Sequence, residues 1–272
     1  MYKKLILMAM AVAMVVTGCA IRKVEAGTNS EDKAVTYNFA TYNVGVFNKS
    51  GVNSAEMVAK MMGEWKLDAI SLNELDSCNT RSGIGVYQLE EFAKLMGGWN
   101  INFASAIDYR GGTYGIGVAV PYEILDRWTV RLPKEDDKEV RALSVVETEK
   151  FVFCSTHLGL TDAAQLSQVD AINAFVEKHF KGYGKPVLLA GDFNATPESE
   201  TISRLSGRWQ ILSSTDSYTY STSKPSKCID YILAYRHAAG CTVKETKVGT
   251  LFRNGDPSIA SDHFPVFVSV EF

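Results

Sequence analysis

Cysteine and histidine are scarce in this sequence: its 272 residues include five cysteines and four histidines. The cysteines have no spacing typical of a zinc site, and Cys154 lies in an apolar run, where a thiol packs as a small hydrophobic group. Cys228 and Cys241 could pair on neighbouring strands if the protein is exported. The sequence therefore predicts no cysteine-based metal site.

An excess of basic residues is also missing, because 28 Lys and Arg face 31 Asp and Glu, for a net charge of −3. Proteins that hold long nucleic acids usually present a basic surface. The charge balance is easier to reconcile with a small or lipid-like anionic substrate that is held through a cation.

No apolar run near the N-terminus is long enough to span a membrane comfortably. Lys3 and Lys4 precede the apolar residues 5–16, which is the pattern of a signal peptide. Cys19 directly follows Gly18, which resembles a bacterial lipobox and implies cleavage before Cys19 and lipid attachment to its sulfur. The alternative is an ordinary signal peptide with an incidental cysteine. We expect a lipoprotein signal peptide at 1–18, a polar flexible tether at 19–34 and one folded domain at 35–272.

Strands and helices alternate along the expected domain, and several strands lead to a polar residue near one end. The expected strands are 36–45, 67–75, 99–105, 114–120, 124–132, 142–148, 151–156, 187–190, 229–234 and 266–270. Helices are expected at 55–65, 88–96 and 163–180, with another starting near residue 198. The order of strand, helix and strand recurs in the second half, which hints at two halves that form two packed sheets with helices outside. Ligands of open α/β sheets bind beyond strand ends, so the polar residues there are candidates for a site.

Four of these polar residues form suggestive pairs. Asp192 and Asn194 follow an apolar strand two residues apart, so both side chains point to the same side of an extended chain. Such a pair can orient a water, hold a hard metal ion or contact a phosphate. Asp230 lies inside an apolar strand, where a charge is costly unless it is paired. Pairing with His263 would remove that cost and orient the imidazole.

Other polar residues are ambiguous by themselves. Asn43 could cap a turn, Glu74 could be a surface acid, and His157 is as compatible with a structural role as with a functional one. His179 and His237 lie away from any motif, and we expect both at the surface.

Six short motifs resemble those of the endonuclease/exonuclease/phosphatase superfamily and occur in that family's order. They are TYNV at 41–44, LNEL at 72–75, STHL at 155–158, GDFN at 191–194, IDYI at 229–232 and SDHFP at 261–265. A single four-residue match is weak evidence, because it arises by chance in roughly one chain in several hundred, whereas six in order across the whole domain are specific. Residues 139–143 (EVRAL) resemble the family's arginine-bearing strand with lower specificity.

The resemblance implies a four-layer α/β sandwich, in which two packed mixed β-sheets are flanked by helices, and metal-dependent hydrolysis of phosphoesters. Asn43, Glu74 and Asp262 would then hold the metal ion. Oxygen ligands without a Cys/His cluster favour Mg²⁺ or Mn²⁺ over Zn²⁺. The ion would neutralise phosphate charge as the transition state forms.

The remaining roles follow from the same resemblance. Asp192 and Asn194 would orient the attacking water and contact the phosphoryl group. His263, held by Asp230, would stabilise or protonate phosphate oxygens or act as the base. The residues that contact the phosphate from the other side would be His157 and Arg141.

Two residues in or beside these motifs bear on the subgroup within the family. His157 and Gly45 both depart from abasic-site repair nucleases, and the former is more similar to the deoxyribonuclease, sphingomyelinase and inositol-phosphatase branches. Residues 218–225 resemble a loop of small bacterial envelope members, in which Tyr218 and Tyr220 either stack on substrate or simply pack.

We expect a monomeric, lipid-anchored enzyme of the bacterial cell envelope. Its substrates would be lipid-headgroup or small-molecule phosphoesters, with diesters favoured over monoesters. The alternatives are an envelope endonuclease or exonuclease that acts on nucleic acid and, more remotely, a non-catalytic binding protein.

Overall fold

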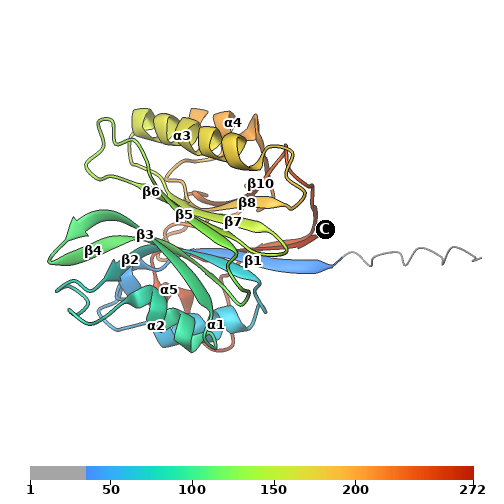
Figure 1. The fold of residues 1–272 in the computed structure, drawn as a ribbon. Coiled ribbons are helices and arrows are strands. Elements are labelled where there is room, and N and C mark those ends of the chain that lie inside the picture. Colours follow the sequence, from blue (N-terminus) through green and yellow to red (C-terminus); the bar gives the residue numbers. More distant parts are fainter. Residues whose placement is uncertain (1–34) are drawn as a thin grey trace, which may run out of the picture. The chain divides into compact units, whose positions relative to one another are not determined.

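A computed structural model describes residues 35–272, so the predicted signal peptide, the tether and the lipidation site Cys19 lie outside the described residues. Two mixed six-stranded sheets form the fold (Figure 1). The first contains, in spatial order, β11 (Thr242–Val248), β12 (Val266–Glu271), β1 (Thr36–Asn43), β2 (Ala69–Ser77), β4 (Gly112–Val120) and β3 (Asn100–Tyr109). The second contains β5 (Asp126–Arg131), β6 (Ala142–Glu147), β7 (Val152–His157), β8 (Val187–Asp192), β10 (Asp230–Tyr235) and β9 (Trp209–Ile211).

Helices cover the outer face of each sheet (Figure 1). The first sheet is covered by α1 (Ala55–Gly63), α2 (Gln88–Leu95) and α5 (Pro257–Ala260), and the second by α3 (Asp162–Phe180) and α4 (Glu200–Ser206). A short 3-10 helix, η1 (Gly45–Phe47), follows β1. The expected four-layer α/β sandwich is therefore confirmed.

The core between the sheets is built from side chains on alternate positions of the strands. Phe39 of β1 stacks against Phe153 of β7, with ring centroids 5.3 Å apart. Ala40 and Tyr42, on the opposite face of β1, instead pack under the helices of the first sheet. Both faces of β1 are thus largely buried.

One parallel strand pair lies in each sheet. β1 pairs with β2 and β7 pairs with β8, whereas every other pairing within residues 35–272 is antiparallel. α1 connects the first parallel pair and α3 the second. The side chain of Thr161 caps α3 by accepting a hydrogen bond from the backbone N–H of Ala164. The duplication hinted at by the order of elements is therefore real at the level of topology.

The structure departs from the sequence prediction at several places. β3 and β4 extend to a tight turn at Arg110 and Gly111, where both residues have positive φ. β9, β11 and α5 were not anticipated, because they are short or, for β11, a mostly exposed edge strand rich in charge.

The pairing of Cys228 with Cys241, which the sequence left open, is absent from the structure. Cys228 and Cys241 are both free, because Cys228 precedes β10 of the second sheet whereas Cys241 precedes β11 of the first. Cys154 is buried, as expected. No helix within residues 35–272 is both long enough and apolar enough to cross a membrane.

Candidate active site

A cavity of about 490 Å³ lies where strands of both sheets end. The register of the parallel pairs aligns polar residues there: Asn43 of β1 is opposite Asn73 of β2, and His157 of β7 is opposite Asp192 of β8. Eight of the residues singled out in the sequence line the cavity, namely Glu74, Arg141, His157, Asp192, Asn194, Tyr220, Asp262 and His263. Together with two buried residues behind this lining, these side chains represent all six motifs and the arginine-bearing segment.

Those buried residues are Asn43 and Asp230, which lie behind the lining and hydrogen-bond to it. The two loop tyrosines differ from each other. Tyr220 lines the cavity, with its ring centroid 4.8 Å from that of His263, whereas Tyr218 is 55% exposed and lies outside the lining. His179 and His237 are exposed, as predicted.

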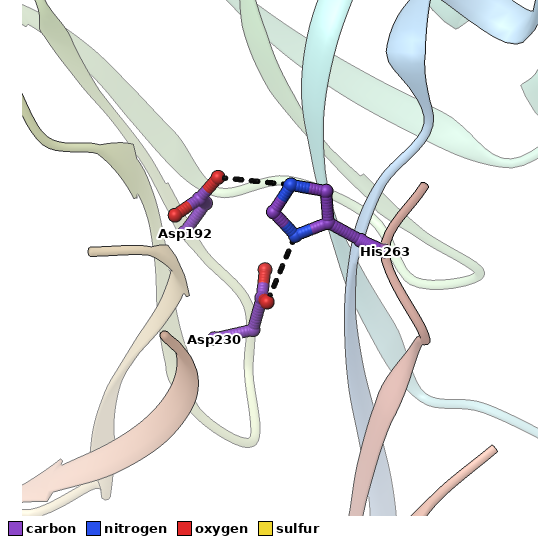
Figure 2. A group of neighbouring side chains, drawn as sticks. All are labelled: Asp192, Asp230 and His263. Atoms are coloured by element: carbon purple, nitrogen blue, oxygen red, sulfur yellow. Dashed lines mark hydrogen bonds and ion pairs between the residues drawn. The ribbon is translucent and has the colours of Figure 1, made fainter. Parts of the chain in front are cut away.

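His263 is held between two carboxylates (Figure 2). Its Nδ1 lies 3.0 Å from Oδ2 of Asp230, and its Nε2 lies 3.6 Å from Oδ2 of Asp192. The two aspartates are register partners on β10 and β8, so the sheet itself sets this geometry. Burial by itself would lower the pKa of His263, but the charges of Asp230 and Asp192 outweigh it and raise that pKa to about 10. The predicted pairing with Asp230 is thus present and favours an imidazolium.

His157 has the opposite electrostatic setting. Burial, the guanidinium of Arg141 and the charge of His263 hold the pKa of His157 well below its usual value. Nη1 of Arg141 lies 3.4 Å from Nδ1 of His157, and Nε2 of His157 lies 3.5 Å from Oδ2 of Asp192. Because guanidinium can only donate, Nδ1 must accept, which places the proton of the neutral ring on Nε2, facing Asp192.

Asp192 is the point at which these groups converge. Its Oδ2 accepts a hydrogen bond from Nδ2 of Asn43 at 3.0 Å, and its Oδ1 accepts one from the backbone N–H of Asn194 at 2.9 Å. Burial and the nearby Asp230 charge raise the pKa of Asp192 to about 6. The Asn194 side chain donates to the Leu158 carbonyl at 3.0 Å. The i, i+2 pair predicted from the sequence therefore does share one site.

Glu74 lies at an irregular point of β2. The pairing of β2 with β4 shifts register between Leu72 and Leu75, and Glu74 has φ of +59°. A non-glycine residue in the left-handed region is unusual and persists only when its surroundings fix it. Oε1 of Glu74 accepts a hydrogen bond from Nδ2 of Asn43 at 3.1 Å, so Asn43 bridges the carboxylates of Glu74 and Asp192.

These contacts bear on the predicted role of Asn43 as a metal ligand. The side-chain nitrogen of Asn43 faces the two carboxylates, while its Oδ1 accepts a hydrogen bond from the backbone N–H of Gly45 at 3.2 Å. Any contact of Asn43 with a cation would use that oxygen.

Lys49 was not anticipated from the sequence. Its Nζ lies 2.8 Å from Oδ2 of Asp262. Although burial alone would lower the pKa of Lys49, its hydrogen bond to Asp262 and the charge of Glu74 raise it. The carboxylates of Glu74 and Asp262, which we call the acidic end of the cavity, thus already attract one cationic side chain.

Asn73 and Tyr114 were also missed. Asn73 joins the sheets, because its Nδ2 donates to the Thr156 carbonyl at 2.8 Å and its Oδ1 accepts from the Asp192 backbone N–H at 3.0 Å. Tyr114 lines the cavity, and burial together with the charge of Glu74 raises the pKa of its hydroxyl. The sequence signal for Asn73 was its position inside an apolar strand, where an amide must find partners.

Within residues 35–272, two groups of side chains could hold a metal ion. Asp192, Asp230 and His263 offer ligand atoms within 4.8 Å of one another. The other group is the acidic end with Glu74 and Asp262, where Oδ1 of Asp262 is buried without a hydrogen-bond partner. An unpartnered buried carboxylate oxygen is costly, and a hard cation is a suitable partner for it.

Gly191 is required for the close approach of β7 and β8 below the site. A Cβ at this position would lie 1.9 Å from the Thr156 carbonyl oxygen. Gly191→Ala should therefore lower the free energy of unfolding by about 2 kcal/mol or more, as measured by urea denaturation. Gly63→Ala, in an open position of α1, is the matched control and should be neutral or stabilising. Equal stability of the two variants would contradict the packing described.

The model of the Endonuclease/Exonuclease/phosphatase family matches residues 40–263 of the chain. No curated protein matches the sequence. Among solved structures, a family member from Leptotrichia buccalis is 18% identical with a TM-score of 0.70, covering 87% of this chain and 100% of that one. A mannosyl-6-phosphatase from Bacteroides thetaiotaomicron is 16% identical with a TM-score of 0.69, covering 87% and 100%. The human Nocturnin catalytic domain is 15% identical with a TM-score of 0.64, covering 88% and 96%. At such identities these likenesses establish the fold.

Proposed function

The chain belongs to the endonuclease/exonuclease/phosphatase family, and we propose that it is a divalent-metal-dependent hydrolase of phosphoester bonds. The observation that carries the proposal is the convergence on one cavity of Asp192 with the Asp230–His263 pair and, beside them, the acidic end at Glu74 and Asp262. The pKa values of His157 and His263 are shifted in opposite directions, which is typical of acid–base chemistry rather than of a passive binding surface.

Glu74 and Asp262, assisted by Asn43, are the proposed metal ligands. Nδ1 of His263 is hydrogen-bonded to Oδ2 of Asp230 at 3.0 Å, so an ion held through that nitrogen would have to replace this contact. The oxygen-rich acidic end suits Mg²⁺ or Mn²⁺. When bound, such an ion polarises the phosphoryl group and neutralises its charge.

The other side chains of the cavity have proposed roles in proton transfer and phosphate binding. Asp192 can accept a proton from the attacking water, because its raised pKa brings it closer to neutrality, where a general base is most effective. His263 as an imidazolium would stabilise or protonate a phosphate oxygen. Arg141 and His157 would contact the phosphate from the opposite wall, and Nε of Arg141 is buried without a partner and free to donate. Asn194 would hold the phosphoryl group with the second hydrogen of its amide.

The proposed substrate is a small or lipid-headgroup phosphoester. The cavity volume of about 490 Å³ lies within the range of small-molecule sites. Lys49, Lys138 and Lys227 line it and would favour an anionic ligand, while the net charge of −3 opposes binding of long nucleic acid. The mannosyl-6-phosphatase among the structural neighbours supports including sugar phosphates among the candidates.

A substrate panel tests this assignment. The purified protein with Mg²⁺ would be assayed against bis-p-nitrophenyl phosphate, sphingomyelin, phosphoinositides, sugar phosphates, and single- and double-stranded DNA and RNA. We expect turnover of at least one small or lipid phosphoester, with a higher kcat/KM than for nucleic acid. Faster cleavage of nucleic acid would favour the envelope nuclease, and no turnover of any substrate would favour a binding protein.

We further propose attachment to the bacterial cell envelope through lipidated Cys19, on the strength of the lipobox resemblance. Cys19→Ser should move the protein from the membrane fraction to the soluble fraction of an expressing bacterium, because the lipid supplies the anchor. Immunoblots of the two fractions measure this. A wild-type chain found wholly in the soluble fraction would contradict the anchor.

A further inference from the structure

An ion pair with a buried carboxylate lies two residues after Glu74 in β2. Asp76 is fully buried, and Arg81 donates to its two carboxylate oxygens from Nε at 2.8 Å and from Nη2 at 2.6 Å. The hydroxyl of Ser82 donates to the same carboxylate at 2.6 Å. The guanidinium also lies over the Tyr109 ring, 4.5 Å from its centroid. This arrangement fixes both the strand and the loop that follows it.

Gln88, at the start of α2, connects β2 near this ion pair to the segment that follows β1. Its Oε1 accepts from the backbone N–H of Asp76 at 2.7 Å, and its Nε2 donates to the Val46 carbonyl at 2.6 Å. The same Nε2 lies 3.1 Å from the Ser82 hydroxyl. β1 ends at Asn43, so it offers no backbone partner to β2 at Asp76. The Gln88 amide therefore occupies the place that a peptide group of a longer β1 would take.

The two segments that Gln88 joins are the ones that present Asn43 and Glu74. Gly45, Val46 and Phe47, immediately after β1, have φ of +50°, +54° and +52°. Glu74 has φ of +59°. Left-handed backbone is unfavourable for Val, Phe and Glu, so neither segment would keep this conformation without contacts that hold it. Gln88 supplies such a contact to both.

We propose that Gln88, which lies beside the Asp76–Arg81 ion pair, is a positioning residue that sets the placement of Glu74 relative to Asn43 and thereby the affinity of the site for a divalent cation. The proposal rests on the proposed function, in which Glu74 is a metal ligand. Hydrogen-bond partners of ligand side chains commonly change metal affinity by about 10- to 100-fold when they are removed. Gln88 acts one step farther away, through the backbone that carries the ligand.

Calorimetric titration with Mn²⁺ tests the proposal on the purified protein without substrate. Gln88→Met keeps the size of the side chain and removes its hydrogen bonds. We expect the Kd for Mn²⁺ to rise about tenfold or more. Asn102→Ala is the matched control, since Asn102 is a buried amide that bridges β3 to β5 and β6 through Trp128, Ser144 and Val145. It should lose comparable stability and keep the wild-type Kd.

The possible outcomes separate this inference from the proposed function. A wild-type protein that binds no Mn²⁺ overturns the metal assignment, and the inference with it. Wild-type binding together with equal Kd values for Gln88→Met and Asn102→Ala overturns only the inference. If Gln88→Met does not fold, Arg81→Lys replaces it, because lysine keeps the charge but loses the bidentate contact with Asp76. Its Kd for Mn²⁺ is then compared with that of Asn102→Ala in the same way. Recovery of turnover by Gln88→Met at high Mn²⁺ would support positioning over general damage.

Discussion

Replacing His263 by alanine should lower kcat for bis-p-nitrophenyl phosphate by about 10³-fold, within the range that positioned acid–base groups supply. The imidazolium lies between Asp230 and Asp192 at the inner wall of the cavity, so its loss removes the group proposed to stabilise or protonate the phosphate. Initial rates with saturating Mg²⁺ measure the effect, and circular dichroism shows whether the fold is kept. His237→Ala, at an exposed position, is the control and should retain full activity.

The Asp230–His263 pair also predicts how the rate depends on pH. Activity that needs the imidazolium is present below the pKa of His263 and is lost as pH rises through it. Asp230 is a main cause of the raised pKa, so Asp230→Asn should move the alkaline limb of the profile to lower pH. An unchanged alkaline limb, or an active His263→Ala variant, would remove His263 from the proposed mechanism.

Glu74→Gln should reduce kcat/KM by about 10³-fold, because several kcal/mol of charge stabilisation by the metal depend on its principal carboxylate. The same variant should bind Mg²⁺ much more weakly, and excess Mg²⁺ should restore part of the activity. Magnesium titrations of the initial rate measure both effects. Glu90→Gln is a suitable control, since Glu90 forms an exposed pair with Lys94 on α2.

An unchanged magnesium dependence in Glu74→Gln would contradict the placement of the metal. Attention would then shift to the alternative cluster of Asp192, Asp230 and His263. In that case the protonated state of His263 would also need to be abandoned, because a ligating imidazole is neutral.

The sequence predicted the parts of the site that depend on local pattern. A polar residue after an apolar strand marked Asp192, and an acid within an apolar strand marked Asp230 and led to its partner, His263. Six ordered motifs gave the fold class. Each of these signals is carried by a few neighbouring residues, so tertiary structure was not needed to find them.

The parts that were missed depend on contacts between distant segments. Asn73 bridges the sheets, and Lys49 reaches Asp262 from more than 200 residues away. Neither contact produces a periodic pattern in the sequence. The sequence left open whether Cys228 and Cys241 pair for the same reason, because it does not reveal that β10 and β11 lie in different sheets.

Both halves of the fold use buried glutamines to hold loops at the site. Gln88 of α2 ties β2 to the turn after β1, and Gln165 of α3 donates to the carbonyls of Gly159 and Asn194 at 2.9 and 3.1 Å. The two glutamines lie on helices that are not equivalent in the repeat, because α1 rather than α2 corresponds to α3, so each half holds its loops in its own way.

The most direct test of metal-dependent phosphoester hydrolysis is one time course of bis-p-nitrophenyl phosphate turnover by the purified protein. Mg²⁺ is present at the start, EDTA is then added in excess, and Mg²⁺ is finally restored. We predict hydrolysis that stops with EDTA and resumes with Mg²⁺, and no response in Glu74→Gln at the same magnesium concentration. Hydrolysis that continues undiminished in EDTA, or none with any divalent ion and any phosphoester of the panel, would contradict the account.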